Sequence, residues 1–214
     1  MKYTVTFDGR ESTIYGYEPA EYVSSYLERG TFYEEPLLKY LANRYSGIRS
    51  VVDVGANIGN HSVFFHDVMG VRDITAFEPN PDNYRRVLKS LPFAKVHQVA
   101  LSDKEGSVNS ISHGANMGAS FCTEGGDIPT ATLDSYNLSP NLIKIDAENM
   151  ECQVLRGALE TIKRSKPVLI VEHQDIQKFY EFNRILNESG VDYLVKPFVE
   201  ETWEMFEYTP IGKL

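Results

Sequence analysis

The stretch that decides the fold is Val51-Val52-Asp53-Val54-Gly55-Ala56-Asn57-Ile58-Gly59-Asn60, an apolar run that turns at glycine and leads into a helix-like segment. Residues 51–54 fit a short buried strand, and the residues after Gly59 fit the first turn of a helix. The two glycines permit a tight turn in which the backbone comes close to a ligand, and the helix start offers free N–H groups. This order predicts a ligand site at the carboxyl end of a parallel strand.

Strand-like and helix-like segments alternate through most of the chain around this motif. Such alternation predicts a mostly parallel sheet with helices on both faces. Two final strand-like runs follow each other without a helix, which predicts an antiparallel pair at one edge. We therefore expect an α/β, Rossmann-like fold with a doubly wound seven-stranded sheet and an antiparallel edge strand. The expected strands cover residues 51–54, 74–77, 96–101, 142–145, 168–171, 193–198 and 203–208, and the expected helices 60–69, 79–91, 150–163 and 176–189.

The first 45 residues precede this alternation. Two strand-like runs, 2–7 and 11–16, flank Asp8-Gly9, a dipeptide that suits the positive φ values of a tight hairpin turn. Residues 18–45 have helical character, interrupted near Gly30, and Pro36 fits the first turn of a helix. We expect residues 1–45 to form a hairpin and helical extension packed on a core of residues 46–214, in one structural unit.

The composition excludes some classes of protein. The formal net charge is −9, which disfavours nucleic acid as a partner because a polyanion is repelled by an acidic surface. No apolar run approaches the roughly 20 residues that span a bilayer, and the first residues lack the apolar core of a signal peptide. We therefore expect a cytoplasmic protein without a membrane span. The two cysteines, Cys122 and Cys152, indicate small buried residues rather than a disulfide framework.

An acidic residue at the end of the second strand strengthens the ligand-site prediction. Glu78 follows Gly59 by 19 positions, and an acid at this place can accept both hydroxyls of a ribose. A dinucleotide site would favour glycine where Asn57 stands, because a pyrophosphate has to touch the backbone there. Asp53 suits the ammonium of S-adenosylmethionine (SAM) and would repel a pyrophosphate. These residues favour SAM, with a nicotinamide-dependent oxidoreductase as the alternative from another class.

At these residues the sequence resembles the FkbM family of methyltransferases, over roughly Phe32 to His173. The resemblance is carried by several short motifs rather than by any one of them. They are Phe32-Tyr33-Glu34, Val52-Asp53-Val54-Gly55-Ala56-Asn57-Ile58-Gly59, Phe77-Glu78-Pro79, Val99-Ala100-Leu101-Ser102, Ile143-Lys144-Ile145-Asp146-Ala147-Glu148, Val154-Leu155-Arg156-Gly157-Ala158 and Val171-Glu172-His173.

The resemblance implies a class I methyltransferase fold, SAM as cofactor with S-adenosylhomocysteine as product, and O-methylation of a hydroxyl, commonly on a sugar, glycan or natural product. The family usually has glycine where this chain has Asn149, and asparagine tolerates the left-handed backbone that such a turn needs. His61 is expected near the methionine end of the cofactor. The residues expected to bind the cofactor are Asp53, Gly55, Asn57, Gly59, Asn60, Glu78, Ala100, Leu101, Ser102 and Asp146.

Transfer of a methyl group to a hydroxyl needs the oxygen held in line and benefits from a base. The ends of the fourth and fifth strands supply four candidate catalytic residues. We expect His173 or Asp146 to remove the proton, with Glu148 and Glu172 orienting the acceptor or the base; a histidine titrates near neutral pH, which favours it on chemistry. The alternative is that Glu172 and His173 pair with the backbone or with neighbouring strands.

The sequence leaves two further features undecided, a metal site and a lid. Asp146, Glu148, Glu172, His173 and Asp175 could supply ligands to Mg²⁺ or Mn²⁺, but acids this loosely spaced more often contact a cofactor or sugar, so a metal is possible and not claimed. The glycine-rich stretch 107–132 reads as turns and short strands, and its part from Gly114 to Gly126 is a candidate lid.

The acceptor is the least determined partner. The 13 tyrosines fit a sugar or glycan hydroxyl acceptor, because aromatic faces stack on sugar rings, although packing explains most of them equally well. A lipid or small natural product is the alternative acceptor, and a SAM-binding subunit without turnover is the alternative function. The sequence leaves the oligomeric state open.

Overall fold

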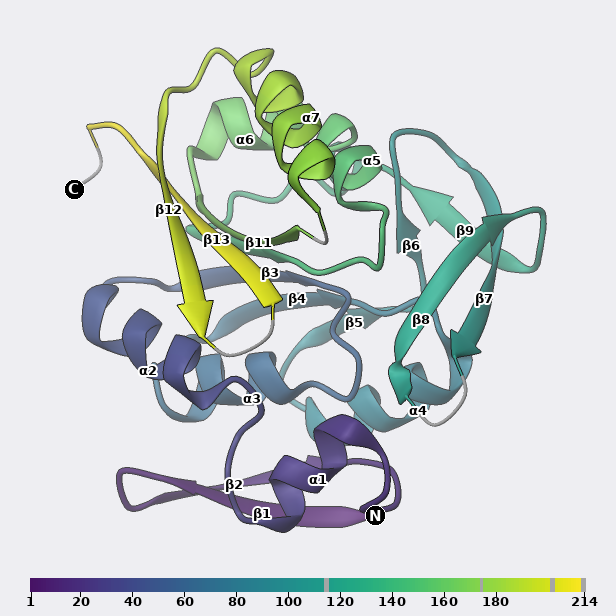
Figure 1. Ribbon diagram of the computed structural model, residues 1–214, viewed down its shortest axis with the longest axis vertical. Helices are drawn as coiled ribbons and strands as arrows, with labels where there is room; N and C mark the ends of the chain where they lie inside the picture. The colour runs from purple at the N-terminus through teal and green to yellow at the C-terminus, as the bar shows by residue number, and fades with distance from the viewer. Residues whose placement is uncertain (114–115, 174, 201–202, 213–214) are drawn as a thin grey trace.

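The computed structural model describes residues 1–113, 116–173, 175–200 and 203–212. A seven-stranded sheet runs through the middle of the molecule (Figure 1). Its central strands are apolar on both sides because helices cover both faces. The strands are β3 (Ser50–Val54), β4 (Asp73–Phe77), β5 (Lys95–His97), β10 (Leu142–Ile145), β11 (Val168–His173), β12 (Tyr193–Glu200) and β13 (Trp203–Pro210).

The strand order in this sheet is β12-β13-β11-β10-β3-β4-β5. The five strands from β11 to β5 pair in parallel. β13 runs antiparallel to both of its neighbours, so that β12 forms the outer edge. The expected doubly wound sheet and the antiparallel pair at one edge are confirmed, with the antiparallel strand lying one position inside that edge.

Helices cover the two faces of the sheet and create two apolar cores. Alternate residues of β3 point to opposite faces: Val51 packs with Phe64 in one core, and Val52 packs with Phe182 in the other. Side-chain caps fix some helix starts; Asn80 accepts two backbone N–H groups before a proline. One face carries α2 (Glu35–Arg44), α3 (Asn60–Asp67) and α4 (Pro81–Ser90), and the other carries α5 (Glu151–Arg156), α6 (Leu159–Ser165) and α7 (Ile176–Asn187).

The glycine-rich stretch forms a second, smaller sheet beside the main one (Figure 1). Its order is β6-β9-β7-β8, where β6 pairs in parallel with β9 and the other contacts are antiparallel. The candidate lid from Gly114 to Gly126 falls partly on residues 114–115, which lie outside the described residues. The strands are β6 (Ala100–Leu101), β7 (Gly106–His113), β8 (Asn116–Glu124) and β9 (Ile128–Ala131), and a 3₁₀ helix, η1 (Leu133–Tyr136), follows them.

Two expected elements are wrong in their extent. The strand expected over 96–101 is two strands, β5 in the main sheet and β6 in the small one. The helix expected over 150–163 is two helices, α5 and α6, separated at Gly157. A Cβ atom on Gly157 would lie 2.0 Å from the carbonyl oxygen of Ser102. The helix therefore breaks where the backbone after β6 packs directly against it.

The N-terminal residues form β1 (Lys2–Phe7), β2 (Arg10–Tyr15) and α1 (Tyr22–Glu28), at the bottom of Figure 1. Asp8 and Gly9 both have positive φ in the hairpin turn, as expected. The hairpin joins the larger hydrophobic core: the rings of Phe7 and Phe64 meet edge to face with centroids 5.0 Å apart. At its other end the Tyr15 N–H donates to Ser90 Oγ in α4.

A buried glutamate ties α2 to β13. Glu207 accepts hydrogen bonds from Tyr40 (2.6 Å), from the Nε of Arg44 (2.8 Å) and from Tyr45. It lies on β13, the strand whose Met205 packs in the larger core. These contacts fix α2, near the N-terminal end of the chain, to β13, near its C-terminal end.

Candidate active site

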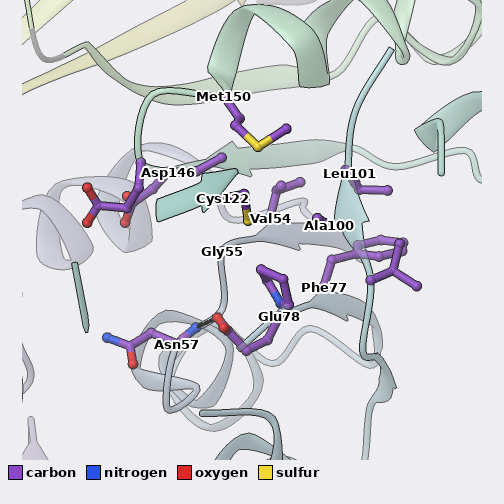
Figure 2. A pocket seen from close by; sticks show the side chains of 14 residues that line it. Val54, Gly55, Asn57, Phe77, Glu78, Ala100, Leu101, Cys122, Asp146 and Met150 are labelled. Carbon is purple, nitrogen blue, oxygen red and sulfur yellow. Dashed lines mark hydrogen bonds between the residues drawn. The ribbon is translucent and has the colours of Figure 1, made fainter. Parts of the chain in front are cut away.

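A solvent-open pocket with an empty volume of about 570 Å³ lies at the carboxyl ends of β3, β4 and β10. This is the edge where ligands bind in parallel α/β sheets. Figure 2 shows Asp146 and Asn57 at one end and Ala100, Leu101 and Phe77 at the other. The lining residues are Val54, Gly55, Asn57, Phe77, Glu78, Pro79, Val99, Ala100, Leu101, Cys122, Asp146, Ala147, Glu148 and Met150.

The turn after β3 forms the floor of the pocket. Gly55 has φ +74°, and a Cβ there would lie 1.7 Å from the carbonyl oxygen of Asp146, so only glycine fits. Asn57 also adopts a left-handed backbone, with φ 51°. Its buried Oδ1 atom has no hydrogen-bond partner among the described residues. This oxygen is therefore an unsatisfied polar group next to the pocket.

Glu78 directly follows β4 and also lines the pocket. Its Oε2 accepts the N–H of Asn57 at 2.7 Å (Figure 2). Its Oε1 accepts the N–H of Asn80 at 2.9 Å, and the two bonds hold the carboxyl group in one orientation. The residue is only 4% exposed. Burial raises the pKa of Glu78 to about 7 against the opposing effect of these hydrogen bonds.

The other end of the pocket is apolar. Ala100 and Leu101 of β6 line it beside Phe77, while Cys122 of β8 and Met150 close it from the side. Ser102 is buried just behind this wall: its N–H donates to Ala131, and its hydroxyl contacts the Asp103 carboxylate. Ser102 therefore supports the wall and does not line the pocket.

Asp53 is fully buried beneath the pocket floor. Its Oδ2 accepts the hydroxyl of Ser62 at 2.7 Å, and its Oδ1 lies 3.6 Å from the Nζ of Lys144. Asp53 and Lys144 are register partners on adjacent parallel strands. Asp53 is therefore compensated from within the protein and does not line the pocket.

Lys144 is a site residue that the sequence analysis did not predict. Its buried ammonium lies 3.0 Å from Asp146 Oδ2 and donates to the Gly55 carbonyl at 3.0 Å. Burial alone would lower the pKa of Lys144, but the carboxylates of Asp146 and Asp53 raise it above its ordinary value. A lysine inside an apolar strand, as in Leu142-Ile143-Lys144-Ile145, was the available signal, since lysine is rarely buried without a partner.

Asp146 and Glu172 form a carboxyl pair at the polar end. Burial raises the pKa of Asp146, but the Lys144 ammonium and a hydrogen bond from Glu172 outweigh it and hold that pKa below its usual range. For Glu172, burial and the charge of Asp146 raise the pKa well above its usual range. Asp146 is thus the carboxylate and Glu172 the protonated partner. Glu172 lies behind Asp146 and outside the pocket lining.

The turn after β10 carries Glu148 into the pocket lining. Glu148 and Asn149 both have positive φ, 47° and 77°. Asparagine thus adopts the left-handed backbone expected for the family's glycine. The buried carboxylate of Glu151 closes this turn by accepting the N–H groups of Ala147 and Asn149. Glu151 is a second residue that the sequence analysis did not predict, although an acid in the first turn of a helix is a common capping signal.

His173 lies on the opposite face of β11 from Glu172. It is 1% exposed, and its Nε2 is 2.8 Å from the hydroxyl of Tyr208. The rings of Phe179, Phe182 and Phe206 surround it with centroid distances from 4.9 to 5.5 Å. Burial lowers the pKa of His173 to about 4. The structure brings together Asp146, Glu148 and Glu172 but places His173 in the other hydrophobic core, in the arrangement that the alternative interpretation describes.

Two residues at the start of α3 hold the turn in place. Gly59, with φ +92°, packs against Leu91 and Val87. The amide of Asn60 accepts the N–H of Tyr33 and donates to its carbonyl, both at 3.0 Å. Gly59 and Asn60 thus support the pocket from outside its lining.

Within the residues that the structure describes, no group of three or more His, Cys, Asp or Glu side chains is arranged to hold a metal ion. Of the residues expected as metal ligands, Asp146 is paired with Lys144, and Asp175 caps α7 by accepting the N–H groups of Gln177 and Lys178. Across the described chain, no helix combines the length and apolar character that a membrane crossing requires.

A family model matches most of the chain, and one curated protein is a more distant relative. The model of the methyltransferase FkbM domain matches residues 53–195. Hexuronic acid methyltransferase AglP of Haloferax volcanii is 26% identical over 149 residues, which are 64% of this chain and 61% of that protein. The chain therefore spans less than two thirds of this curated relative.

Solved structures show the same fold at low identity. Methyltransferase FkbM from Methylobacillus flagellatus KT superposes with a TM-score of 0.58 at 21% identity, covering 77% of this chain and 44% of its own. The tRNA (uracil-54, C5)-methyltransferase of Pyrococcus abyssi, solved in complex with S-adenosyl-L-homocysteine, has a TM-score of 0.54 at 11% identity, over 98% of this chain and 44% of its own. Since the family model matches more than half of the sequence, this chain belongs to the FkbM family of methyltransferases.

Proposed function

We propose that this protein transfers a methyl group from SAM to a hydroxyl of a sugar or glycan. The observation that carries the proposal is the two-ended pocket, which has a fixed carboxyl group at its middle, an apolar wall at one end and the Asp146 carboxylate at the other. Family membership supports the methyl transfer and the cofactor.

The residues of the pocket fit SAM. Glu78 offers a rigidly held carboxyl group for the two ribose hydroxyls. Ala100, Leu101 and Phe77 offer an apolar surface for the adenine. The Asp146 carboxylate offers an acceptor for the ammonium of the methionine part. When bound, SAM supplies a methyl group on a positively charged sulfur.

In this proposal, the charged side chains at the polar end of the pocket have different roles. Lys144 holds Asp146 as a carboxylate and pins the carbonyl of Gly55, while Asp53 balances the buried charge from below. Glu172, kept protonated, donates to Asp146 and sets its orientation. Asp146 and Glu148 then face the acceptor hydroxyl from the lining of the pocket.

A cluster of tyrosines next to this end supports a sugar acceptor. The rings of Tyr22, Tyr26 and Tyr33 pack edge to face with centroids 5.4 to 5.8 Å apart, and Tyr22 is 39% exposed. Exposed aromatic rings suit the C–H faces of a sugar, and their hydroxyls can bind its hydroxyls. Two backbone hydrogen bonds tie Tyr33 to the amide of Asn60, which comes directly after the turn that lines the pocket. The similarity to a hexuronic acid methyltransferase points to the same acceptor class.

The first test is isothermal titration of the protein with SAM and with S-adenosylhomocysteine, repeated on Glu78→Ala and on the exposed control Glu105→Ala. We expect micromolar binding that is lost in Glu78→Ala and kept in the control. No heat from a folded sample with either ligand would refute the cofactor assignment.

The second test is methyl transfer from labelled SAM to a panel of sugars, uronic acids, lipids and small phenols, with and without excess EDTA. We expect product with sugars, at a methyl ether position, and unchanged rates in EDTA. Turnover confined to lipids or phenols would refute the sugar proposal while leaving the cofactor in place. Loss of activity in EDTA would show a metal requirement.

A further inference from the structure

The N-terminal segment, residues 1–45, sends one tyrosine hydroxyl toward the carboxyl group proposed to bind the ribose. Tyr17 follows β2, and its hydroxyl donates a 2.6 Å hydrogen bond to Oδ1 of Asn83 in α4. The same amide group donates from Nδ2 to Oε1 of Glu78 over 3.5 Å, and Glu78 lines the pocket. A line of hydrogen bonds thus runs from the N-terminal segment to the pocket.

Contacts outside the pocket hold Tyr17 in place. Its backbone N–H donates to Oγ of Ser24 at 3.0 Å, and its carbonyl accepts the hydroxyl of Tyr3 at 2.6 Å. The guanidinium of Arg86 lies over its ring, 3.5 Å from the centroid. Burial raises the pKa of Tyr17 to about 12, so the hydroxyl keeps its proton near neutral pH. Tyr17 therefore offers Asn83 a fixed hydrogen-bond donor.

The orientation of the Asn83 amide decides what Glu78 meets. Asn83 is 1% exposed, and its backbone N–H donates to Oδ1 of Asn80 at 3.1 Å. An amide side chain donates from its nitrogen and accepts at its oxygen. Because the Tyr17 hydroxyl occupies the oxygen, the amide turns its N–H groups toward the carboxyl group. The reverse orientation would bring an oxygen to Glu78 and repel the carboxylate.

We propose that Tyr17 is a positioning residue of the cofactor site, which acts through Asn83 to hold Glu78 in the orientation that binds the ribose of SAM. This inference rests on the SAM binding proposed above. It extends the site to a residue outside 53–195, the range that matches the family model. The N-terminal segment then contributes to cofactor affinity as well as to the hydrophobic core.

The protonation of Glu78 reports on this arrangement. Burial raises its pKa, and the hydrogen bonds from Asn80, Asn57 and Asn83 lower it. Loss of the Asn83 bond should therefore raise that pKa further, while removal of the Tyr17 hydroxyl leaves the neighbouring charges in place. The charged and titratable groups around Glu78 and Tyr17 include Lys144 of β10, Cys122 of β8, Asp82 and Arg86 of α4, and Glu21 before α1.

The test is calorimetric titration with SAM and S-adenosylhomocysteine across the pH range around neutrality, for the wild type, Tyr17→Phe, Asn83→Ala and the double variant. Tyr17→Phe keeps the ring under Arg86 and removes only the hydroxyl. We expect it to weaken binding about 3- to 10-fold near neutral pH, the effect of one hydrogen bond, and to move the midpoint of the pH dependence upward. The matched control is Tyr15→Phe, two residues earlier, whose hydroxyl donates to neither Asn83 nor Glu78; it should behave as the wild type.

The double variant should bind no more weakly than Asn83→Ala, because the hydroxyl has nothing to act on once the amide is gone. Additive losses overturn the route through Asn83. Wild-type affinity in Tyr17→Phe, or weaker binding with an unshifted pH midpoint, overturns the positioning role and leaves the cofactor assignment standing. A wild-type protein that binds neither ligand refutes the cofactor assignment itself. Should Asn83→Ala fail to fold, the pH midpoint of Tyr17→Phe decides alone.

Discussion

The backbone N–H of Asn57 donates a 2.7 Å hydrogen bond to Oε2 of Glu78 and thereby joins the turn after β3 to the end of β4. The two residues come from neighbouring parallel strands, and the bond fixes the acid on the side of the pocket where a ribose is proposed to lie. Its carboxyl group has a pKa raised to about 7 by burial. The proposed cofactor site thus contains a group that titrates near neutral pH.

We expect SAM affinity to depend on pH through Glu78. Ribose hydroxyls donate to the carboxylate, so binding is full above pH 7 and weakens as protonation sets in below it. From pH 8 to pH 6 the affinity should fall up to about tenfold, the factor for one pH unit below the pKa. Calorimetric titration with S-adenosylhomocysteine at both values measures this. Glu78→Gln should bind more weakly at both and without the pH dependence; the same dependence in that variant would contradict the assignment.

Removal of the buried cation should destabilise the fold. Lys144→Met leaves Asp53 uncompensated beneath the pocket, and breaking a buried ion pair in this way costs about 3–5 kcal/mol. Urea unfolding followed by circular dichroism gives the free energy of unfolding. The double variant Lys144→Met/Asp53→Asn should recover much of the loss because Asp53 no longer carries an unpaired charge. Equal stability of the wild type and Lys144→Met would show that the ammonium does not compensate Asp53.

How far the sequence could predict this site is visible at Lys144 and His173. The glycine turn and Glu78 were predictable because their spacing reflects a backbone requirement, and the structure places Gly55, Asn57, Glu78, Ala100, Leu101 and Asp146 around one pocket. Lys144, the partner of Asp53, was not predictable, because it comes from a strand about 90 residues later in the chain. The pairing of two strands is part of the tertiary structure and cannot be inferred from the local sequence pattern.

His173 shows that suitable chemistry alone does not identify a site residue. It follows Glu172 at the end of a strand near the site, and its ordinary pKa suits a base. Neighbouring residues of a strand point to opposite faces, so Glu172 reaches Asp146 while His173 enters the aromatic core. The sequence pattern located the strand but not the face of each residue. The split of the expected helix at Gly157 has a similar origin, since it depends on the approach of the Ser102 backbone.

His173 should contribute a pH-dependent part of the stability. Its pKa is lowered to about 4 by burial, so the unfolded chain takes up a proton below about pH 6.5 while the folded protein resists it until about pH 4. The free energy of unfolding should fall by up to about 3 kcal/mol across this window. Denaturant unfolding at several pH values, compared with His173→Phe, isolates the effect.

The activity of a His173 variant is a separate expectation. Because the ring is enclosed away from the pocket, a folded His173→Gln protein at pH 8 should keep its SAM affinity and most of its turnover rate. Steady-state kinetics beside calorimetric titration checks both. If the turnover rate instead falls to the extent expected for loss of a general base, about 100-fold or more, while SAM still binds, His173 returns to the role of base and the placement described above is contradicted.

Gly157 should be intolerant of any side chain. Its φ is ordinary, but a Cβ would lie 2.0 Å from the carbonyl oxygen of Ser102. Gly157→Ala should therefore cost about 1–3 kcal/mol through overpacking and loosen the wall formed by β6. Gly47→Ala is the matched control, because no atom lies within 4 Å of its Cβ position. Thermal unfolding of the two variants measures the loss of stability. Equal melting temperatures would show that the Ser102 backbone moves to make room for the added methyl group.

The position of β13 has a consequence for biosynthesis. This strand lies between β12 and β11, although the ribosome makes it after both. Until it emerges, β12 has no partner in the sheet, and α2 lacks the hydrogen bonds that Glu207 provides. A nascent chain that has already made every group of the pocket must still wait for this strand before its sheet closes. Translation pauses before residue 203 would therefore lengthen the time during which an unpaired strand edge is open to chaperones and to aggregation.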